Sequence, residues 1–287
     1  MIEIKSKKNG EILFSTSADT LVGVDLREAD LTDADLSKAD LRQANLSHVD
    51  LSYANLEQAQ LQQANLIGAH LAHAKLDYAN LTETRLSDGT PFSGAILFEA
   101  GLHRAKLVGA DLRYADLHQA DLSYAILSKA FLQGADLHQA NLRCTHLCGA
   151  MFIGANLSAS DLRQTNLCNV HLNSANLMGA NLSEALSINN DEQKTHKPPT
   201  LVGANLTRAI LVGANLSYAV LKDANLYHAD LRNTNLSYAL LGGAHLRRAN
   251  VADADFTGVE LAAVIMDFAN FSKAKNADIP SYKRNLR

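Results

Sequence analysis

A five-residue period governs the sequence of this 287-residue chain. From Val24 the chain reads VDLRE ADLTD ADLSK ADLRQ ANLSH, and an apolar residue, nearly always Leu, recurs at every fifth position almost to the end. We call this position the centre of the repeat. A short period sustained over so much of a chain is the signature of a repeat architecture, in which each unit buries its apolar side chains against its neighbours.

Two apolar positions recur in each repeat. Leu occupies 42 of 48 centres, which run over residues 21–86, 92–182 and 201–271, and Ala stands two residues before the centre in 35 repeats. In a helix, successive Leu side chains would be rotated by about 140° and would scatter around the axis. In a long strand they would alternate between the two faces. The pattern therefore indicates a short extended segment with Ala and Leu inward, followed by a corner.

Glycine marks the expected corner. Twelve of the 16 Gly lie two residues after a centre, among them Gly94 after Phe92. Glycine tolerates positive φ, which a chain needs where it bends sharply. Asp or Asn precedes most centres, and these side chains accept hydrogen bonds from nearby backbone groups in turns.

The repeat resembles the A(D/N)LXX signature of the pentapeptide-repeat proteins over residues 21–182 and 201–271. The resemblance implies an all-β fold, a right-handed quadrilateral β-helix of about 12 coils interrupted by one long loop. In that fold four pentapeptides form the four sides of a 20-residue coil. The centres then form the core, and those expected there include Leu26, Leu31, Leu36, Leu41, Leu112, Leu117, Leu206 and Leu211.

Two departures from the repeat lie in the first third of the chain. Residues 1–20 contain two short apolar stretches around Asn9-Gly10, a strong hairpin signal, and they predict an N-terminal β-hairpin that caps the first coil. Near residues 87–91 one spacing grows from five to six, which indicates a bulge at a corner.

The largest departure is the polar stretch 183–200, SEALSINNDEQKTHKPPT, after which the β-helix continues over 201–271. Its composition and the Pro198-Pro199 pair predict a loop that leaves the coil. Loops on a rigid scaffold often carry recognition, whereas simple tolerance of an insertion explains the same stretch, and both interpretations stay open. The residues of this loop that are candidates for partner binding are Asp191, Glu192, Lys194 and His196.

Outward side chains can be paired from the sequence, because residues 20 apart stack on neighbouring coils. Two apolar pairs are candidate partner contacts, Phe131 with Met151 and Val220 with Leu240. Scattered apolar surface is the alternative interpretation.

Residues 272–287 predict a C-terminal cap or tail. Just before them, Ile265 and Phe268 are expected to point outward. They either lie under the terminal cap or make an end-to-end contact between two copies, as in some relatives of the resembled family.

No catalytic or metal-binding motif stands out. Cys144, His146, Cys148 and Cys168 resemble zinc ligands in type but not in spacing. A convex coil with a filled axis offers no pocket that excludes water. We therefore expect no catalytic residue, no metal, no cofactor and no small-molecule ligand.

Charge and hydropathy limit the partners and the location. The net charge of −4 excludes a strongly basic surface for direct nucleic-acid binding. No stretch approaches the roughly 18 apolar residues of a membrane-spanning helix, and the start, MIEIK, has no apolar leader core. We expect a cytoplasmic protein without membrane contact.

These observations predict a non-enzymatic scaffold that binds a protein partner. The resemblance offers an alternative, because some pentapeptide-repeat proteins mimic duplex DNA and protect DNA gyrase. Mimicry requires a densely acidic surface, and only residues 1–90 are acidic, with 14 acidic and 8 basic side chains. A structural spacer or end-to-end assembling unit is a further alternative, favoured weakly by the 10 basic and 7 acidic side chains of residues 201–287.

Overall fold

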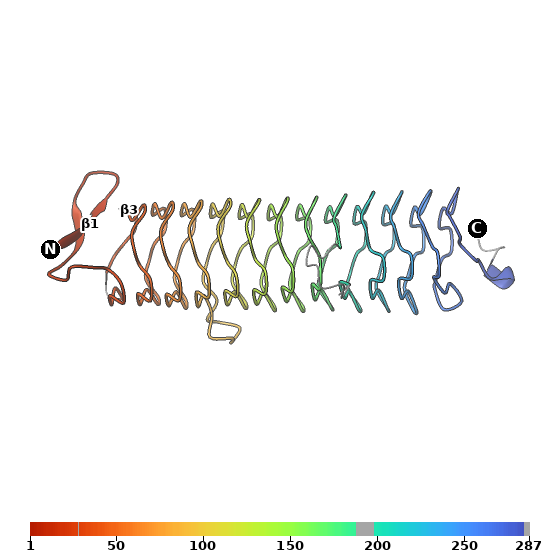
Figure 1. The fold of residues 1–287 in the computed structure, drawn as a ribbon, viewed down its shortest axis with the longest axis horizontal. Helices are drawn as coiled ribbons and strands as arrows, with labels where there is room; N and C mark the ends of the chain where they lie inside the picture. The colour runs from red at the N-terminus through yellow and green to blue at the C-terminus, as the bar shows by residue number, and fades with distance from the viewer. Residues whose placement is uncertain (28, 188–197, 284–287) are drawn as a thin grey trace, which may run out of the picture. The chain divides into compact units, whose positions relative to one another are not determined.

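The computed structural model describes residues 1–27, 29–187 and 198–283. Two compact units, Met1–Thr145 and His146–Arg287, each consist of stacked four-sided coils (Figure 1). Within each unit, residues 20 positions apart pair in parallel on neighbouring coils, as Asp25 does with Asn45 and Asn205 with Asn225. This arrangement confirms the predicted right-handed quadrilateral β-helix.

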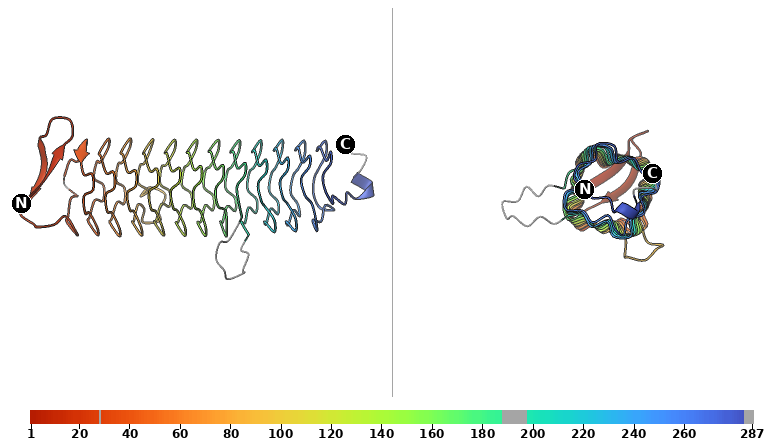
Figure 2. Two further views of the ribbon diagram at one scale, coloured as in Figure 1. Left: turned by 45° about the horizontal axis from the view of Figure 1, so that its top comes forward. Right: turned by 90° about the vertical axis from the view of Figure 1, so that its right-hand side faces the viewer.

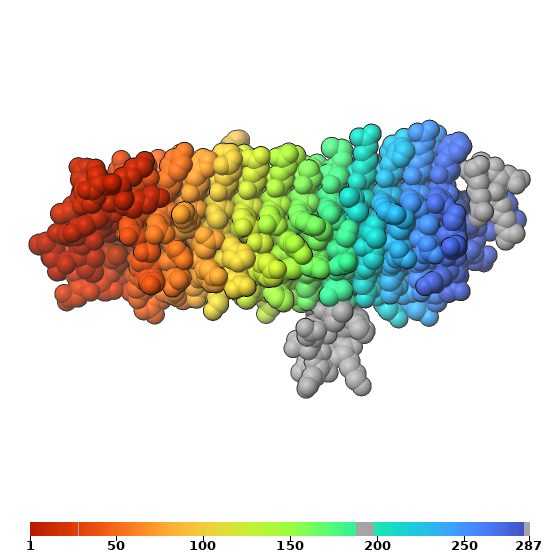
Figure 3. Space-filling model, turned by 90° about the horizontal axis from the view of Figure 1, so that it is seen from above, coloured from red at the N-terminus to blue at the C-terminus, as the bar shows by residue number. Residues whose placement is uncertain are grey.

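Backbone hydrogen bonds join each coil to the next, two along a side and a third at the corner, where the amide of Gln119 donates to His138 over 2.9 Å. On one side the amide of the centre Leu117 donates to the carbonyl of Asp136 over 2.7 Å, and the amide of Asp136 donates back to Ala115 over 3.0 Å. Side chains of successive coils therefore stack in columns. Figure 3 shows the successive coils of each unit packed against one another. The centres fill the axis, and the following are at most 2% exposed: Leu26, Leu31, Leu36, Leu41, Leu112, Leu117, Leu206 and Leu211.

The corner explains the polar part of the repeat. Except at Asp88 and Ala263, the described residue two places after the centre adopts positive φ, between 51° and 61° when it is not glycine, as at Gln119. The amide of Ala120 then donates back to the carbonyl of Leu117 over 3.1 Å. The carboxylate of Asp116 accepts from the amide of His118 over 3.1 Å. An Asp or Asn before the centre thus stabilises the bend that follows it.

The N-terminal residues form a small antiparallel sheet with strand order β2-β1-β3. Strand β1 (Ile2–Ser6) pairs with β2 (Ile12–Thr16) on one side and with β3 (Ala34–Asp35) on the other. Because β3 is part of a coil, this pairing attaches the hairpin to the start of the first unit (Figure 2). Ile4 is buried on the inner face of β1.

At the C-terminal end of the second unit, the last paired side contains Lys275, which pairs with Asp255. A single 3₁₀ turn, η1 (Ser281–Lys283), follows. The ammonium group of Lys283 donates to the carbonyls of Leu261 and Val264 over 3.1 and 2.5 Å. It thus gives a partner to the Val264 carbonyl, whose equivalents in earlier coils accept from the amide of the next coil.

The first insertion shows that one expected centre is wrong. Arg85 pairs with Asp111, 26 residues later, so this coil contains six extra residues and not one. The amide of Ala95 donates to the carbonyl of Leu86 over 2.7 Å, which makes Leu97 the next centre. Phe92 is 99% exposed. Phenylalanine matches a centre in hydrophobicity, but it lies within the inserted loop and not on a side of the coil.

The expected role of Gly94 as a corner glycine is also wrong. Unlike the other corner glycines, Gly94 has no positive φ. A side chain there would lie 2.1 Å from the carbonyl oxygen of Tyr114. Glycine is needed here because two backbone segments approach closely, and not because the chain turns a corner.

The second insertion is shorter than residues 183–200. The amide of Leu186 donates to Thr165 over 2.8 Å, so the coil continues through this residue, and Thr200 pairs with His171, 29 positions earlier. The coil therefore carries nine extra residues, and Ser187 takes the place of a centre. Asp191, Glu192, Lys194 and His196 lie outside the described residues.

Candidate interaction surfaces

Two tyrosines stack on one corner of the second unit. The rings of Tyr218 and Tyr238 are 5.1 Å apart between centroids and are inclined by 12°. Both residues are half-exposed and adopt positive φ at the corner. The ring of Tyr238 lies over Gly258, where a side chain would approach it to 2.5 Å. Glycine at this corner thus leaves room for the tyrosine stack.

Val220 and Leu240 follow the tyrosines by two residues and pair on adjacent coils. Leu240 is 50% exposed, and Val220 is partly buried. We call these four residues, Tyr218, Val220, Tyr238 and Leu240, the Tyr218–Leu240 surface. The sequence-based pairing of Val220 with Leu240 is found in the structure, whereas binding by either residue stays a prediction.

A cavity of about 320 Å³ adjoins this surface. Leu240, Gly242, Ala262 and Ala263 are among the residues that line it, together with the charged pair Lys222 and Glu260. Small residues at 242, 262 and 263 leave space that a larger side chain would fill. The result is an apolar hollow beside exposed aromatic rings, with one charge of each sign among its lining residues.

After the second insertion the chain returns to the coil next to the same surface. The amide of Val220 donates to the carbonyl of Pro199 over 3.0 Å. The chain therefore returns from the insertion one coil before Val220, at the corner that Tyr218 occupies in the next coil.

The first unit carries an aromatic row that the sequence reasoning missed. Tyr53 stacks on His73 with centroids 4.7 Å apart, and Phe98 stacks on His118 at 4.1 Å. His73 meets the edge of Phe98 at 5.2 Å. The six inserted residues shift the spacing between these coils, so a search for residues 20 apart does not align His73 with Phe98.

A second row occupies the next corner of the first unit. His103 lies edge-on between Tyr78 and Tyr124, with centroids 6.0 and 5.5 Å away. The guanidinium of Arg104 lies 5.8 Å from the ring of Tyr78 and 5.6 Å from that of Tyr124. Cation–π contacts of this kind hold an exposed arginine in place.

The loop that carries Phe92 is held by its own hydrogen bonds. The carboxylate of Asp88 accepts from the amide and the hydroxyl of Thr90, both over 2.8 Å, and the hydroxyl of Ser93 accepts from the amide of Asp88 over 3.0 Å. Hydrogen bonding to Ser93 and Thr90 lowers the pKa of Asp88 to about 2. Phe92 is thus presented on an ordered loop.

The remaining predicted contacts are separate from these surfaces. Phe131 is exposed in the first unit, and Met151 is partly buried in the second. Ile265 and Phe268 stay exposed, Phe268 at 59%, although η1 follows the last coil. The described residues therefore do not bury them under a cap. Two guanidinium groups lie 5.9 Å from the ring of Phe268, those of Arg247 and Arg248.

Several of the acidic side chains are neutralised within their own repeat. Where Arg follows the centre, it pairs with the Asp before the centre, as Arg27 does with Asp25 and Arg42 with Asp40, both at 2.7 Å. The hydrogen bond from each arginine lowers the pKa of its partner Asp. The acidic first third is consequently less negative at its surface than its carboxylate count indicates.

Cys148 and Cys168 lie on adjacent coils, since the amide of Gly149 donates to the carbonyl of Cys168 over 2.9 Å. Among the described residues, no three His, Cys, Asp or Glu side chains are grouped so that they could hold a metal ion. The same part of the chain contains no helix with the length and hydrophobicity needed to cross a membrane.

These features define a solenoid protein built from stacked five-residue sides. The family model for pentapeptide repeats matches in eight copies, over residues 20–58, 50–88, 100–139, 115–152, 132–167, 152–186, 201–237 and 239–275. The matches include most of the sequence, and the chain belongs to the pentapeptide-repeat family.

Solved structures of two relatives are similar. HetL from the cyanobacterium Nostoc, a pentapeptide-repeat protein involved in the regulation of heterocyst differentiation, is 33% identical over 82% of this chain and 88% of its own, with a TM-score of 0.36. A trypsin-treated form of QnrB1, a plasmid-mediated fluoroquinolone resistance protein, is 20% identical over 65% of this chain and 91% of its own, with a TM-score of 0.50. At this identity the likeness to QnrB1 shows the fold alone. A comparison with curated protein sequences finds no match.

Proposed function

We propose that the protein is a non-enzymatic scaffold that binds a protein partner through the Tyr218–Leu240 surface. The observation that carries this proposal is the combination of a stacked tyrosine pair, a half-exposed Leu240 and an apolar cavity of about 320 Å³ beside it. Tyrosine is enriched at protein interfaces, and the residues that dominate binding energy often fill a pocket at the centre of the contact.

The backbone of this surface is rigid before any partner binds. The amide of Tyr218 donates to Ser237 over 2.9 Å, and that of Tyr238 donates to Thr257 over 2.7 Å. Stacking further restricts both rings. Because less side-chain freedom is lost on association, more of the contact energy is available as affinity.

The cavity indicates the chemistry of the partner. Its apolar lining suits an aliphatic or aromatic side chain, while Lys222 and Glu260 suit polar groups of either sign around it. A protein surface offers this mixture, whereas the charged groups of a nucleic acid are all negative phosphates.

Affinity capture from the native host tests the proposal with two matched variants. Leu240→Asp places a charge on the surface, and Met178→Asp places the same charge at an exposed residue of the same unit, 47% exposed against 50% for Leu240. We expect a specific partner to bind the wild type and Met178→Asp but not Leu240→Asp. Retention by Leu240→Asp would place the partner elsewhere.

The two alternative functions have less support. Duplex mimicry needs a continuous acidic surface, yet Arg27 and Arg42 neutralise Asp25 and Asp40. An end-to-end spacer would use the exposed Ile265 and Phe268, but Arg247 and Arg248 flank the ring of Phe268. Two copies meeting there would bring like charges together unless acidic groups faced them.

A further inference from the structure

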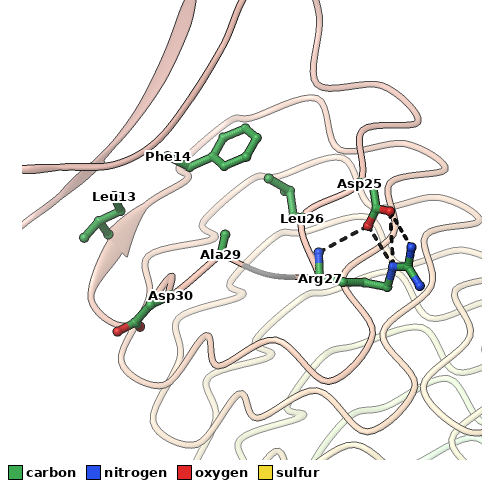
Figure 4. A pocket seen from close by; sticks show the side chains of 7 residues that line it. All are labelled: Leu13, Phe14, Asp25, Leu26, Arg27, Ala29 and Asp30. Carbon is green, nitrogen blue, oxygen red and sulfur yellow. Dashed lines mark hydrogen bonds and ion pairs between the residues drawn. The ribbon is translucent and has the colours of Figure 1, made fainter.

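The N-terminal sheet and the first coil enclose a cleft of about 440 Å³ in the first unit, separate from the Tyr218–Leu240 surface (Figure 4). Leu13 and Phe14 from β2 and Leu26 and Ala29 from the coil form the apolar part of its lining, and Asp30 lies at one side. Asp25 and Arg27 also line the cleft, and because they pair with each other at 2.7 Å they add no net charge. This volume falls in the range of pockets that hold ligands or partner side chains.

A β-bulge places two neighbouring side chains in this cleft. Ile4 lies opposite Phe14, but Lys5 lies opposite Ile12, so Leu13 is an extra residue in β2. In a regular strand Leu13 and Phe14 would point to opposite faces. The bulge re-aims one of them, and both contribute to the lining of the cleft.

The cleft contains an apolar patch formed by Leu13, Phe14 and Leu26. Leu26 is a buried centre of the coil, and its side chain points toward Phe14 in Figure 4. Leu13 and Phe14 are only partly buried. An apolar side chain that entered the cleft would therefore remove further surface of these residues from water.

Two carboxylates without a cation lie beside the cleft. Asp30 pairs in parallel with Asp50 on the next coil, so the two acidic residues are neighbours in one column. Each accepts a backbone hydrogen bond, Asp30 from Thr32 over 3.1 Å and Asp50 from Ser52 over 2.8 Å. Within the described ranges no basic group forms an ion pair with either.

The charge on Asp30 is maintained by these contacts. Hydrogen bonds from Thr32 lower the pKa of Asp30, so its carboxylate stays ionised at neutral pH. The adjacent Asp50 adds a second negative charge, and the repulsion between the two favours a cation placed near both.

Strand β2 also offers backbone groups to a peptide. It is the edge strand in the order β2-β1-β3, so its outer edge pairs with no strand among the described residues. The bulge at Leu13 limits regular pairing to the part of β2 that follows it. An extended partner segment could therefore form hydrogen bonds to β2 only over a short length.

We propose that this cleft binds an extended polypeptide segment of a partner protein in which an apolar side chain stands next to a basic one. The apolar side chain enters between Phe14 and Leu26, and the cation lies against Asp30 and Asp50. The apolar lining, the unpaired edge and the uncompensated charge each select one part of such a segment.

Two short peptides test this proposal on the full-length protein. The first is acetyl-Thr-Leu-Arg-Thr-amide, and the second, acetyl-Thr-Leu-Glu-Thr-amide, differs only in the sign of its charge. Methyl NMR signals of Leu13 and Leu26 report occupation of the cleft. We expect millimolar Leu-Arg peptide to shift both signals and the Leu-Glu peptide to leave them in place.

Substitutions assign the charge contribution. We expect Asp30→Asn combined with Asp50→Asn to weaken binding of the Leu-Arg peptide about two- to five-fold. Asp40→Asn is the matched control, because Asp40 is already paired with Arg42, and it should leave binding unchanged. Absence of methyl shifts, or equal binding of both peptides, would overturn the proposal. Neither outcome depends on the Tyr218–Leu240 surface, which lies in the other unit.

Discussion

Two phenylalanines that look equivalent in the repeat should respond in opposite ways to the same substitution. Phe92 and Phe152 both fall at positions that the five-residue period assigns to a centre. In the structure Phe92 is 99% exposed and Phe152 is 0% exposed. Replacing each by Ala therefore separates the repeat as written from the repeat as folded.

The expected magnitudes follow from burial. A buried phenylalanine removes about 150–250 Å² from water, which at about 25 cal/mol per Å² corresponds to roughly 4–6 kcal/mol as an upper estimate. Measured losses for Phe→Ala in a core are about 3–5 kcal/mol, since the cavity left behind collapses only in part. Phe152→Ala should cost this amount. Phe92→Ala should change the free energy of unfolding by less than about 0.5 kcal/mol.

Hydrogen exchange read by mass spectrometry is the suitable assay, because solenoids do not always unfold in one step and the two residues lie in different units. Peptides around residue 152 should lose protection in Phe152→Ala. Peptides around residue 92 should keep the wild-type exchange rates in Phe92→Ala. A loss above about 1 kcal/mol in Phe92→Ala would refute the assignment of Phe92 to an exposed loop.

Three further outcomes are expected. Thr234→Val should lower the free energy of unfolding by about 0.5–1.5 kcal/mol in urea titrations, because the buried Thr234 hydroxyl donates to the carbonyl of Leu211 over 2.8 Å; an unchanged urea midpoint would contradict this. The pKa of Asp88 falls from 3.8 to about 2 on folding, so the ionised carboxylate stabilises the fold above pH 3.8, and this stabilisation is lost as pH falls through about 2. The difference in urea midpoint between wild type and Asp88→Asn should therefore shrink between about pH 4 and 2. A difference that stayed constant over this range would count against the prediction. Excess protein should leave quinolone inhibition of gyrase supercoiling unchanged, and protection of gyrase would revive duplex mimicry.

The five-residue period predicted short extended sides separated by corners, and the resemblance to the pentapeptide-repeat proteins supplied the four-sided β-helix. The side chains of Leu117 and Ala115 are buried inside the coil, and Asp116 stabilises the corner by accepting a hydrogen bond from the amide of His118. These interactions involve residues close in sequence or one coil away, so their pattern is visible in the chain. The same locality explains why Val220 and Leu240 could be paired in advance.

The insertions could not be predicted in detail, because their ends look like repeats. In the first insertion Phe92 is as hydrophobic as a centre but lies in the loop. In the second insertion Ser187 occupies the position of a centre but is as polar as a loop residue. Hydrogen bonds from Ala95 and Leu186 decide the matter, and these depend on partners that the period does not specify. The contact of His73 with Phe98 could not be aligned for the same reason, since the inserted residues lie between them. The stacking of Phe98 on His118, 20 residues later, was visible in the period but was not singled out.

The pairing of coils is intact on both sides of each insertion, which indicates where the sequence can change in evolution without disrupting the fold. Coils of 26 and 29 residues pair with the adjacent coils in the same parallel manner as coils of 20. The register of pairing is therefore restored after each insertion and does not depend on the number of residues before it. An in-frame insertion at a corner therefore leaves all later residues in their places. One within a side would move every following Leu off the axis until the next corner absorbed the error. Insertions at the corners of this chain can therefore be tolerated with little loss of stability. The sides between the corners are constrained, because their Leu and Ala side chains must fill the axis of the coil.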